Sequence, residues 1–234
     1  MERPSLLVLL RHAESERNKI KRGAVYFQNE YDRTTVKGIP DYQIPITDQG
    51  ASQAAKTGEG LRDDFGTFDY IYHSGYLRTK QTMEGVLGAY APEEQEKMRA
   101  KIRMDPFIRE RDPGYCYDMT QEEAEHNFPW LKDYWKTFGG FFGQPPGGES
   151  LAQMTNRVYL FVNMLFRDRG GKKILVVTHG GTLRCFRFIL ERWDYNQALK
   201  WPPGESPKNC SLTIYDYNSS LSKLVLREHN KVYW

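Results

Sequence analysis

The feature that most constrains the fold is a run of five aliphatic residues, Leu6 to Leu10, which ends at Arg11-His12. The run is too short to cross a membrane and has no polar position, which is typical of a strand buried on both faces of a sheet. Ile174 to Val177 has the same character and ends at Thr178-His179-Gly180. In open α/β sheets, ligands bind at the carboxyl ends of the strands. We therefore expect chemistry at the end of the first strand, at His12.

The rest of the chain predicts helices that alternate with strands in one domain, 1–234. A helix at 150–166 is the clearest element, because Ser150 and Gln153 form a capping box before a helical apolar pattern. The other expected elements are a short helix starting at 14–18, helices at 47–61, 77–90 and 183–190, short strands at 68–73 and 102–108, a charged connector at 92–99, and a terminal edge hairpin of strands 211–217 and 224–228.

Composition excludes several classes of protein. The formal net charge of +3 over 234 residues is small and its charges are mixed, so we expect no nucleic-acid partner. The three cysteines have no metal-type spacing and indicate free thiols in a reducing compartment. No signal peptide and no apolar run long enough to span a bilayer is present. These features predict a cytoplasmic protein. The chain also has no G-x-x-x-x-G-K-[ST] or G-x-G-x-x-G motif and no zinc-type spacing, so its chemistry should need no metal or other cofactor.

Two segments do not fit the alternating pattern. Residues 20–46 are predicted to form a long loop that carries four cations, Lys21, Arg22, Arg33 and Lys37. Either these cations form a solvated basic surface, or one of them contacts an anionic substrate. Residues 115–148 are rich in aromatic side chains and predict two short helices in an insertion over one end of the sheet. This insertion either is a satellite core or contacts a ligand. In the second case an organic leaving group, aromatic or lipid-like, is expected.

Three predicted strands end in similar polar clusters. They supply Arg11-His12, His73-Ser74 with Arg78 one turn later, and Thr178-His179. Parallel strands would bring these clusters to one edge, where two guanidinium groups, imidazoles and helix N-termini favour a phosphate dianion. Each cluster alone is more often structural than catalytic, and their coincidence favours a reaction site.

His12 is the candidate nucleophile, because a neutral imidazole can attack phosphorus and form a phosphohistidine. A carboxyl group must then protonate the leaving oxygen and later deprotonate water. Glu110 is the best candidate, since it follows a predicted strand. Glu14 and Glu149 each open a predicted helix, where the helix dipole explains an acidic residue. The other histidines fit less well: His73 is more simply a strand residue, and His126 and His229 receive no role.

The motif Leu10-Arg11-His12-Ala13-Glu14-Ser15-x-x-Asn18 resembles the signature of the histidine phosphatase superfamily, in its phosphoglycerate-mutase-like branch. The aromatic insertion and the run from Phe107 to Gly114 look closest to a subgroup of broad-range acid phosphatases. Further matches to the superfamily follow in family order along nearly the whole chain. These matches are Asp41, Pro45-Ile46-Thr47-x-x-Gly50, Ser74-x-x-x-Arg78-Thr79-x-Gln81-Thr82, Glu110, Pro146-Gly147-Gly148-Glu149-Ser150 and Val177-Thr178-His179-Gly180-Gly181.

The resemblance implies a three-layer α/β/α fold with a mostly parallel sheet and one antiparallel edge. It also implies that His12 is the phosphorylated nucleophile and that Glu110 is the general acid and base. Arg11, Asn18, Arg78 and His179 would hold the phosphate.

The chain departs from the family pattern at a few positions. Ala13 replaces the usual glycine, so the loop must avoid positive φ there. Pro113 stands near an expected tyrosine, and Gly180-Gly181 replaces the Gly-Asn of the mutases. We therefore predict a metal-independent phosphomonoesterase acting on a small molecule. The alternatives are a phosphoglycerate mutase and a phospho-ligand binding or regulatory module with weak catalysis.

Overall fold

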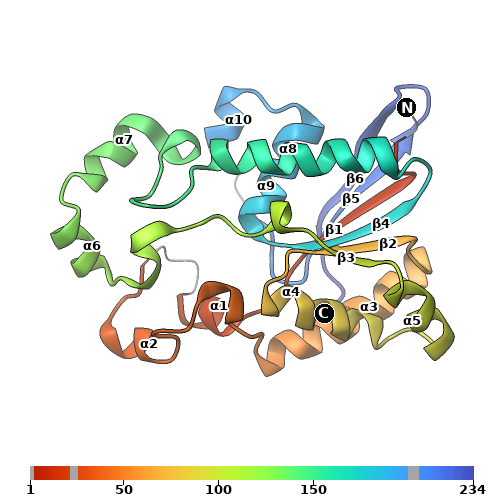
Figure 1. The fold of residues 1–234 in the computed structure, drawn as a ribbon, viewed down its shortest axis with the longest axis horizontal. Coiled ribbons are helices and arrows are strands. Elements are labelled where there is room, and N and C mark those ends of the chain that lie inside the picture. Colours follow the sequence, from red (N-terminus) through yellow and green to blue (C-terminus); the bar gives the residue numbers. More distant parts are fainter. Residues whose placement is uncertain (1–2, 22–25, 200–205) are drawn as a thin grey trace.

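The structure is a computed structural model that describes residues 3–21, 26–199 and 206–234 (Figure 1). Within these residues the sheet has six strands in the order β3-β2-β4-β1-β5-β6. Their bounds are β1 Leu6–Arg11, β2 Tyr70–His73, β3 Ile102–Met104, β4 Lys173–Thr178, β5 Leu212–Asn218 and β6 Lys223–Lys231. The first four run parallel, whereas β5 and β6 form the antiparallel hairpin at one edge. The predicted mostly parallel sheet with one antiparallel edge is confirmed.

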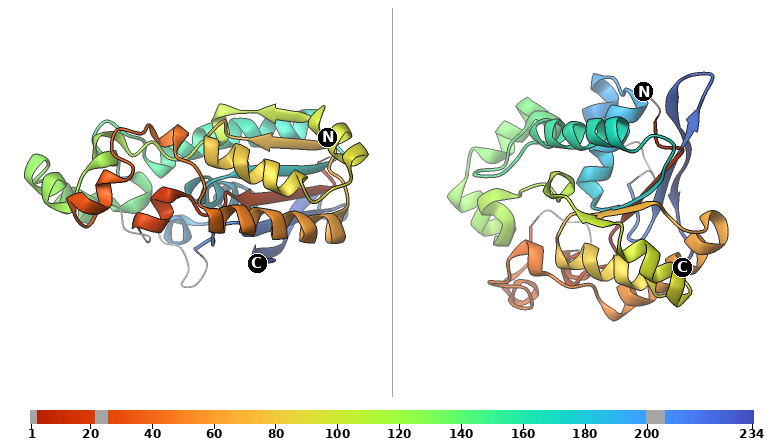
Figure 2. Two further views of the ribbon diagram at one scale, coloured as in Figure 1. Left: turned by 90° about the horizontal axis from the view of Figure 1, so that it is seen from below. Right: turned by 45° about the vertical axis from the view of Figure 1, so that its right-hand side comes forward.

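Helices cover both faces of the sheet, as Figures 1 and 2 show. One layer contains α3 Asp48–Phe65, α4 Leu77–Leu87 and α5 Pro92–Arg99, and the other contains α8 Leu151–Asp168, α9 Gly180–Glu191 and α10 Tyr195–Leu199. Among the described residues, no helix combines the length and the apolar character that crossing a membrane requires.

The alternation of side chains along β1 explains the two layers. Leu6, Val8 and Leu10 pack with α3 and α4, whereas Leu7 and Leu9 pack with α8 and α9. Successive side chains of a strand point to opposite faces, so a central strand with helices on both sides must be apolar throughout. The unbroken aliphatic run in the sequence is therefore the direct result of a strand position inside the sheet.

The remaining elements extend beyond the carboxyl ends of the parallel strands (Figures 1 and 2). They are α1 Glu16–Lys21, α2 Glu30–Thr34, α6 Gln121–Asn127, α7 Leu131–Phe142 and three single 3-10 turns, Asp41–Gln43, Pro106–Ile108 and Gly114–Asp118. The two helices expected within 115–148 are present as α6 and α7. They lie at the end of the molecule where the strands terminate.

Three predicted elements were wrong. The connector at 92–99 is the helix α5, which Pro92 starts and in which Glu94 accepts a hydrogen bond from the Ala91 amide. The long loop at 20–46 contains α2 and a 3-10 turn. The strand expected at 102–108 ends at Met104, because Pro106 begins a 3-10 turn and cannot donate to a strand ladder.

The capping box of α8 yields a stability prediction. The buried Ser150 hydroxyl accepts a hydrogen bond from the Gln153 amide at 3.1 Å. We expect Ser150→Ala to lower the free energy of unfolding by about 1 kcal/mol, because the first turn loses this acceptor. Urea unfolding measures the change. Ser150→Thr keeps a hydroxyl group and is the control; an equal loss in both variants would contradict the assignment to the cap.

Candidate active site

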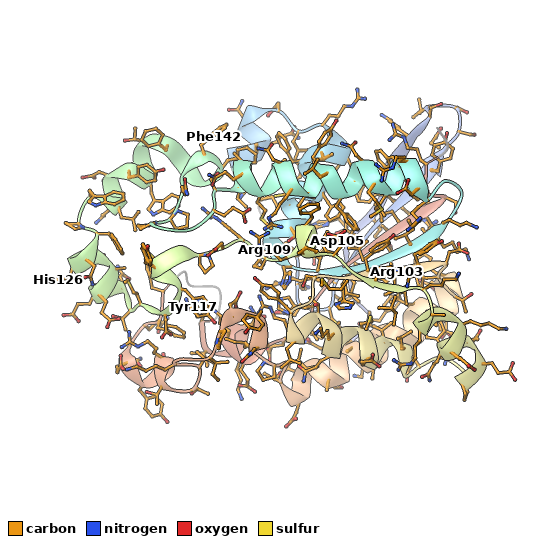
Figure 3. All side chains as sticks on the ribbon, viewed as in Figure 1. Arg103, Asp105, Arg109, Tyr117, His126 and Phe142 are labelled. Atoms are coloured by element: carbon orange, nitrogen blue, oxygen red, sulfur yellow. The ribbon has the colours of Figure 1, made fainter. Side chains whose placement is uncertain are left out.

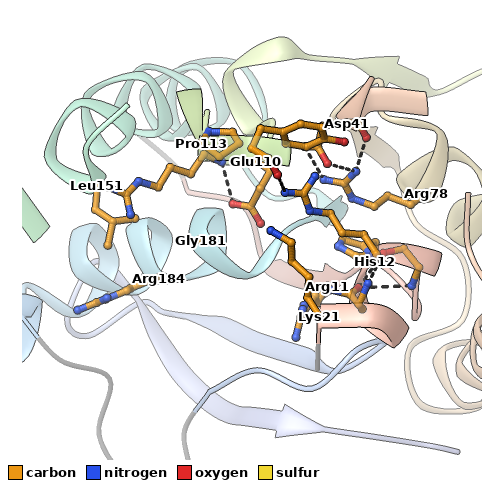
Figure 4. A pocket seen from close by; sticks show the side chains of 15 residues that line it. Arg11, His12, Lys21, Asp41, Arg78, Glu110, Pro113, Leu151, Gly181 and Arg184 are labelled. Carbon is orange, nitrogen blue, oxygen red and sulfur yellow. Dashed lines mark hydrogen bonds and ion pairs between the residues drawn. The ribbon is translucent and has the colours of Figure 1, made fainter. Parts of the chain in front are cut away.

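The strand ends meet at one cavity of about 480 Å³ (Figure 4). Arg11, His12, Asn18, Arg78 and Glu110 all line it. His179 is fully buried beside the cavity, with its ring centroid 5.1 Å from that of His12. The structure therefore brings together all six site residues predicted from the sequence. His73, His126 and His229 are absent from the cavity lining.

The backbone around His12 fixes its ring and its proton. The His12 amide donates to the Thr178 carbonyl at 2.8 Å, which ties the end of β1 to the end of β4. Nδ1 of His12 lies 2.7 Å from the Ala13 carbonyl oxygen. A carbonyl can only accept, so the ring proton is on Nδ1 and Nε2 carries the lone pair. Burial, reinforced by Arg78 and Arg11, holds the pKa of His12 well below its usual value.

Ala13 occupies the signature position without strain. It is buried, and it is not among the residues of positive φ in the described part of the chain. Its amide donates to Oγ1 of Thr82 at 2.9 Å. The methyl group at this position is therefore compatible with the loop that carries His12.

The two arginines of the site are held by different partners. Nη1 of Arg11 donates to the Pro207 carbonyl at 2.6 Å. Both terminal nitrogens of Arg78 donate to the Asp41 carboxylate at 3.1 Å, and Nη1 also reaches the Asp41 carbonyl. A guanidinium group has five N–H donors, so two remain on Arg78 for a ligand. Asp41 entered the sequence analysis only as a motif match, and its role in orienting Arg78 required the structure.

His179 is also oriented by a hydrogen-bonded neighbour. The hydroxyl of Thr79 donates its proton to the Tyr76 carbonyl, so it can only accept a hydrogen bond from the Ser74 hydroxyl. Because the Ser74 proton is used in that bond, the Ser74 oxygen accepts a hydrogen bond from Nε2 of His179 at 2.8 Å. The ring packs edge-on against both His12 and Tyr76. Burial, followed by the charge of Arg78, lowers the pKa of His179 well below its usual value. Both histidines are therefore neutral near pH 7.

The candidate acid Glu110 follows the 3-10 turn 106–108 and points into the cavity (Figure 4). Its Oε1 accepts a hydrogen bond from the Arg111 amide at 2.8 Å. The same oxygen packs against Gly181, where a Cβ atom would lie only 2.5 Å away. A glycine at position 181 therefore makes room for the carboxylate.

The two other candidate carboxylates have structural partners. Glu149 forms a two-point ion pair with Arg157 at 2.8 Å, and Arg157 also donates to the backbone carbonyls of residues 107, 109 and 110. Oε1 of Glu14 accepts from the hydroxyl of Thr47 at 2.9 Å. Of these three candidate carboxylates, only Glu110 is among the residues that line the cavity.

Asn18 belongs to a network that the sequence analysis did not reveal in full. Its Oδ1 accepts hydrogen bonds from Ser15 and from Asn209, and Asn209 also donates to the His12 carbonyl. Asn209 is nearly two hundred residues away in the chain, so no local pattern could have indicated it.

The cations predicted in the 20–46 loop have different surroundings. Lys21 is buried and lines the cavity, which supports contact with an anionic ligand. Arg33 and Lys37 instead pair with Glu30 of α2, and Arg33 also pairs with Glu123 of α6. Arg22 lies outside the described residues. Within the described chain, no group of three His, Cys, Asp or Glu side chains is arranged to hold a metal ion.

The family sequence model of the histidine phosphatase superfamily (branch 1) matches residues 7–230 of this chain. The chain belongs to this superfamily. Among its relatives is the phosphoglycerate mutase-like protein AT74H of Arabidopsis thaliana, which is 28% identical over 93% of this chain and 75% of its own length. A 2,3-bisphosphoglycerate-dependent phosphoglycerate mutase of Rhizobium etli is 29% identical over 93% of both chains.

Solved structures show the same fold for this histidine phosphatase superfamily member. The alpha-ribazole phosphatase from Shigella flexneri superposes with a TM-score of 0.71 over 97% of this chain and 96% of its own, at 20% identity. The phosphoglycerate mutase-like architecture inferred from the sequence is thereby confirmed.

The neutral buried histidines make stability depend on pH. In the unfolded chain a histidine titrates near pH ~6.5, whereas the folded-state pKa values of His12 and His179 are lower. Below pH ~6.5 the unfolded state binds more protons, so the free energy of unfolding falls as the pH falls, by up to about 1.4 kcal/mol per pH unit for each histidine. Above this pH both histidines are neutral in the folded and the unfolded state, so neither makes the free energy of unfolding depend on pH.

Urea unfolding in phosphate-free buffers between about pH 5.5 and 7.5 tests this dependence. His12→Gln should reduce the slope, because one of the two groups is removed. Asn127→Ala, at an exposed position on α6, removes no titrating group and should retain the wild-type slope. An unchanged slope in His12→Gln would contradict the lowered pKa.

Proposed function

We propose that the protein is a phosphomonoesterase that hydrolyses phosphate esters through a phosphohistidine at His12. The observation that carries this proposal is the state of His12: a neutral ring with its proton directed to the Ala13 carbonyl and Nε2 available for attack. It lies among two arginines and a second histidine, with a carboxylate on the same cavity. This combination supplies a nucleophile, an electrostatic clamp and a proton donor.

In the first step, Nε2 of His12 attacks phosphorus while the bond to the ester oxygen breaks. Arg11 and Arg78 hold the non-bridging oxygens and stabilise the charge that develops on them. Nε2 of His179 already donates to Ser74, so His179 contributes through its buried, unpartnered Nδ1, whose protonation the bound dianion favours. Asp41 keeps Arg78 in the geometry that directs its remaining donors to the phosphate. Protonated Glu110 transfers its proton to the leaving oxygen, so the alcohol departs neutral.

In the second step, the Glu110 carboxylate takes a proton from a water molecule that attacks the phosphohistidine. The phosphorus–nitrogen bond breaks, inorganic phosphate leaves and His12 returns to its neutral state. Glu110 ends the cycle protonated, ready for the next ester. The same residue thus serves as acid and then as base.

A phosphoglycerate mutase is the second candidate, supported by relatives of that name at 28–30% identity. Mutase transfer requires the phosphohistidine to survive until a second substrate oxygen accepts the phosphate. Pro113 and Gly181 on the cavity wall replace residues that the mutase pattern would provide, which favours hydrolysis. A binding module with weak catalysis is less favoured, because Glu110 is directed into the cavity.

The nucleophile can be tested directly. We expect His12→Ala to lower phosphate release from p-nitrophenyl phosphate by at least about 10³-fold, because no other group forms the covalent intermediate. Wild-type protein mixed with a ³²P-labelled ester should carry an acid-labile label, and the variant should carry none. Exposed His126→Ala is the control. Near-wild-type turnover in His12→Ala would contradict the mechanism. If the wild-type protein interconverts 2- and 3-phosphoglycerate faster than it releases phosphate, the mutase is favoured instead.

The contact between Glu110 and Gly181 yields a second test. Gly181→Ala places a methyl group against Oε1 of Glu110, so the carboxylate must move. We expect kcat to fall by about 10- to 100-fold, since small displacements of a reacting group are costly. Gly180→Ala is the matched control, because its added methyl group would meet only ordinary contacts 3.6 Å from Arg11. Equal effects of the two substitutions would argue against this positioning of Glu110.

A further inference from the structure

The cavity carries more positive charge than the transfer of one phosphate group requires. Its described wall contains six cationic side chains and two carboxylates, and one of the carboxylates, Asp41, pairs with Arg78. The cations are Arg11, Arg17, Lys21, Arg78, Arg111 and Arg184. A cavity of about 480 Å³ is also large enough to enclose an entire small organic ligand.

Two of these cations, Arg17 and Lys21, form a separate pair on α1. They are four residues apart, so they share one face of the helix, where like charges repel. Arg11 and Arg78 act on the pKa of His12, whereas Arg17 acts on the pKa of Lys21. Besides burial, the charge of Arg78 also contributes to lowering the pKa of Arg17, so the pair borders the clamp around His12 on the wall of the same cavity.

Aromatic rings hold this pair in place. The guanidinium of Arg17 lies 3.7 Å from the ring centroid of Tyr117, and its Nη2 donates to the Tyr117 carbonyl. The ammonium of Lys21 lies 4.4 Å from the ring centroid of Phe27. Such contacts fix cations without neutralising their charge.

One donor of the pair lacks a partner. Nη1 of Arg17 is buried and has no hydrogen-bond partner among the described residues. Leaving a buried charged donor unsatisfied is costly, so such an atom in a cavity wall indicates a missing acceptor. Burial also lowers the pKa of Lys21 to about 7, against the opposing pull of Asp118 and Asp41. An anion bound here would restore the charged form of the lysine.

We propose that Arg17 and Lys21 form a second anion subsite, and that the substrate is a phosphomonoester whose leaving group carries a carboxylate or a second phosphate. This inference rests on the proposed phosphatase function. It replaces the expectation of an aromatic or lipid-like leaving group. Within 115–148, the aromatic residue of the cavity wall is Tyr117, which supports Arg17. His126 and Phe142 mark the outer helices of this insertion in Figure 3, and Phe142 is exposed.

Matched substrate pairs that differ by one anionic group provide the test. The wild-type protein is assayed for phosphate release from glycerol 3-phosphate and 3-phosphoglycerate, and from fructose 6-phosphate and fructose 1,6-bisphosphate. We expect the more anionic member of at least one pair to have a kcat/KM about 10- to 100-fold higher, as charge-assisted hydrogen bonds allow. The first pair tests a carboxylate and the second pair tests a phosphate.

Substitutions locate the preference on α1. Arg17→Met and Lys21→Met remove the charges but keep the aliphatic stems, and each should reduce the ratio of kcat/KM within the preferred pair by about tenfold. Lys19→Met removes an exposed cation from the same helix and should leave the ratio unchanged. Thermal unfolding confirms that each variant is folded.

The outcomes separate this inference from the proposed function. If the wild type hydrolyses both members of every pair equally well, or if Arg17→Met and Lys21→Met both keep the wild-type ratio, the second subsite is refuted and the phosphatase function stands. If the wild type releases phosphate from none of these esters nor from p-nitrophenyl phosphate, the proposed function itself fails.

Discussion

The parallel pairing of β1 with β4 is the constraint on which the rest of the structure depends. Its register places Arg11 opposite Thr178, and one further hydrogen bond joins the His12 amide to the Thr178 carbonyl. His12 and His179 follow these paired residues directly, so the ladder fixes both rings at the same edge. A shift of the register by one residue would reverse which face each side chain occupies. The core on both faces of β1 therefore also maintains the geometry of the site.

The site concentrates positive charge beside two buried imidazoles. Burial, with the arginines Arg11 and Arg78 close by, favours the neutral form of His12, which is the nucleophilic form. The carbonyl of Ala13 then selects the ring nitrogen that keeps the proton. In the proposed reaction, the same charges that suppress protonation also attract the anionic ester. One arrangement would then both prepare the nucleophile and bind its target.

Much of this arrangement could be predicted from local sequence patterns. The buried strands, the capped helix α8 and the terminal hairpin all have short-range signals, and each is present in the structure. Two of the errors occurred where local signals were weak: α5 is highly charged and short, and α2 lies in a segment with little apolar periodicity. The third was a strand predicted too long, although Pro106 is a local signal for its end. Helices of this kind depend on tertiary context and on single caps more than on periodicity.

The sequence by itself determined the class of fold and the six residues that meet at the cavity. Arg11, His12, Arg78 and His179 follow strands with clear apolar patterns, and the rules of parallel sheets bring these strand ends together. Glu110 follows a strand that ends earlier than predicted, and Asn18 was indicated by the resemblance to the family motif. Only the tertiary structure decided their partners. Asp41 is hydrogen-bonded to Arg78, Ser74 to His179 and Asn209 to Asn18, and Gly181 packs against Glu110. It also decided that Arg17 and Lys21 face the cavity and that Tyr117 supports Arg17. Such contacts join residues distant along the chain, and no periodicity records which side chains will meet once the strands have paired.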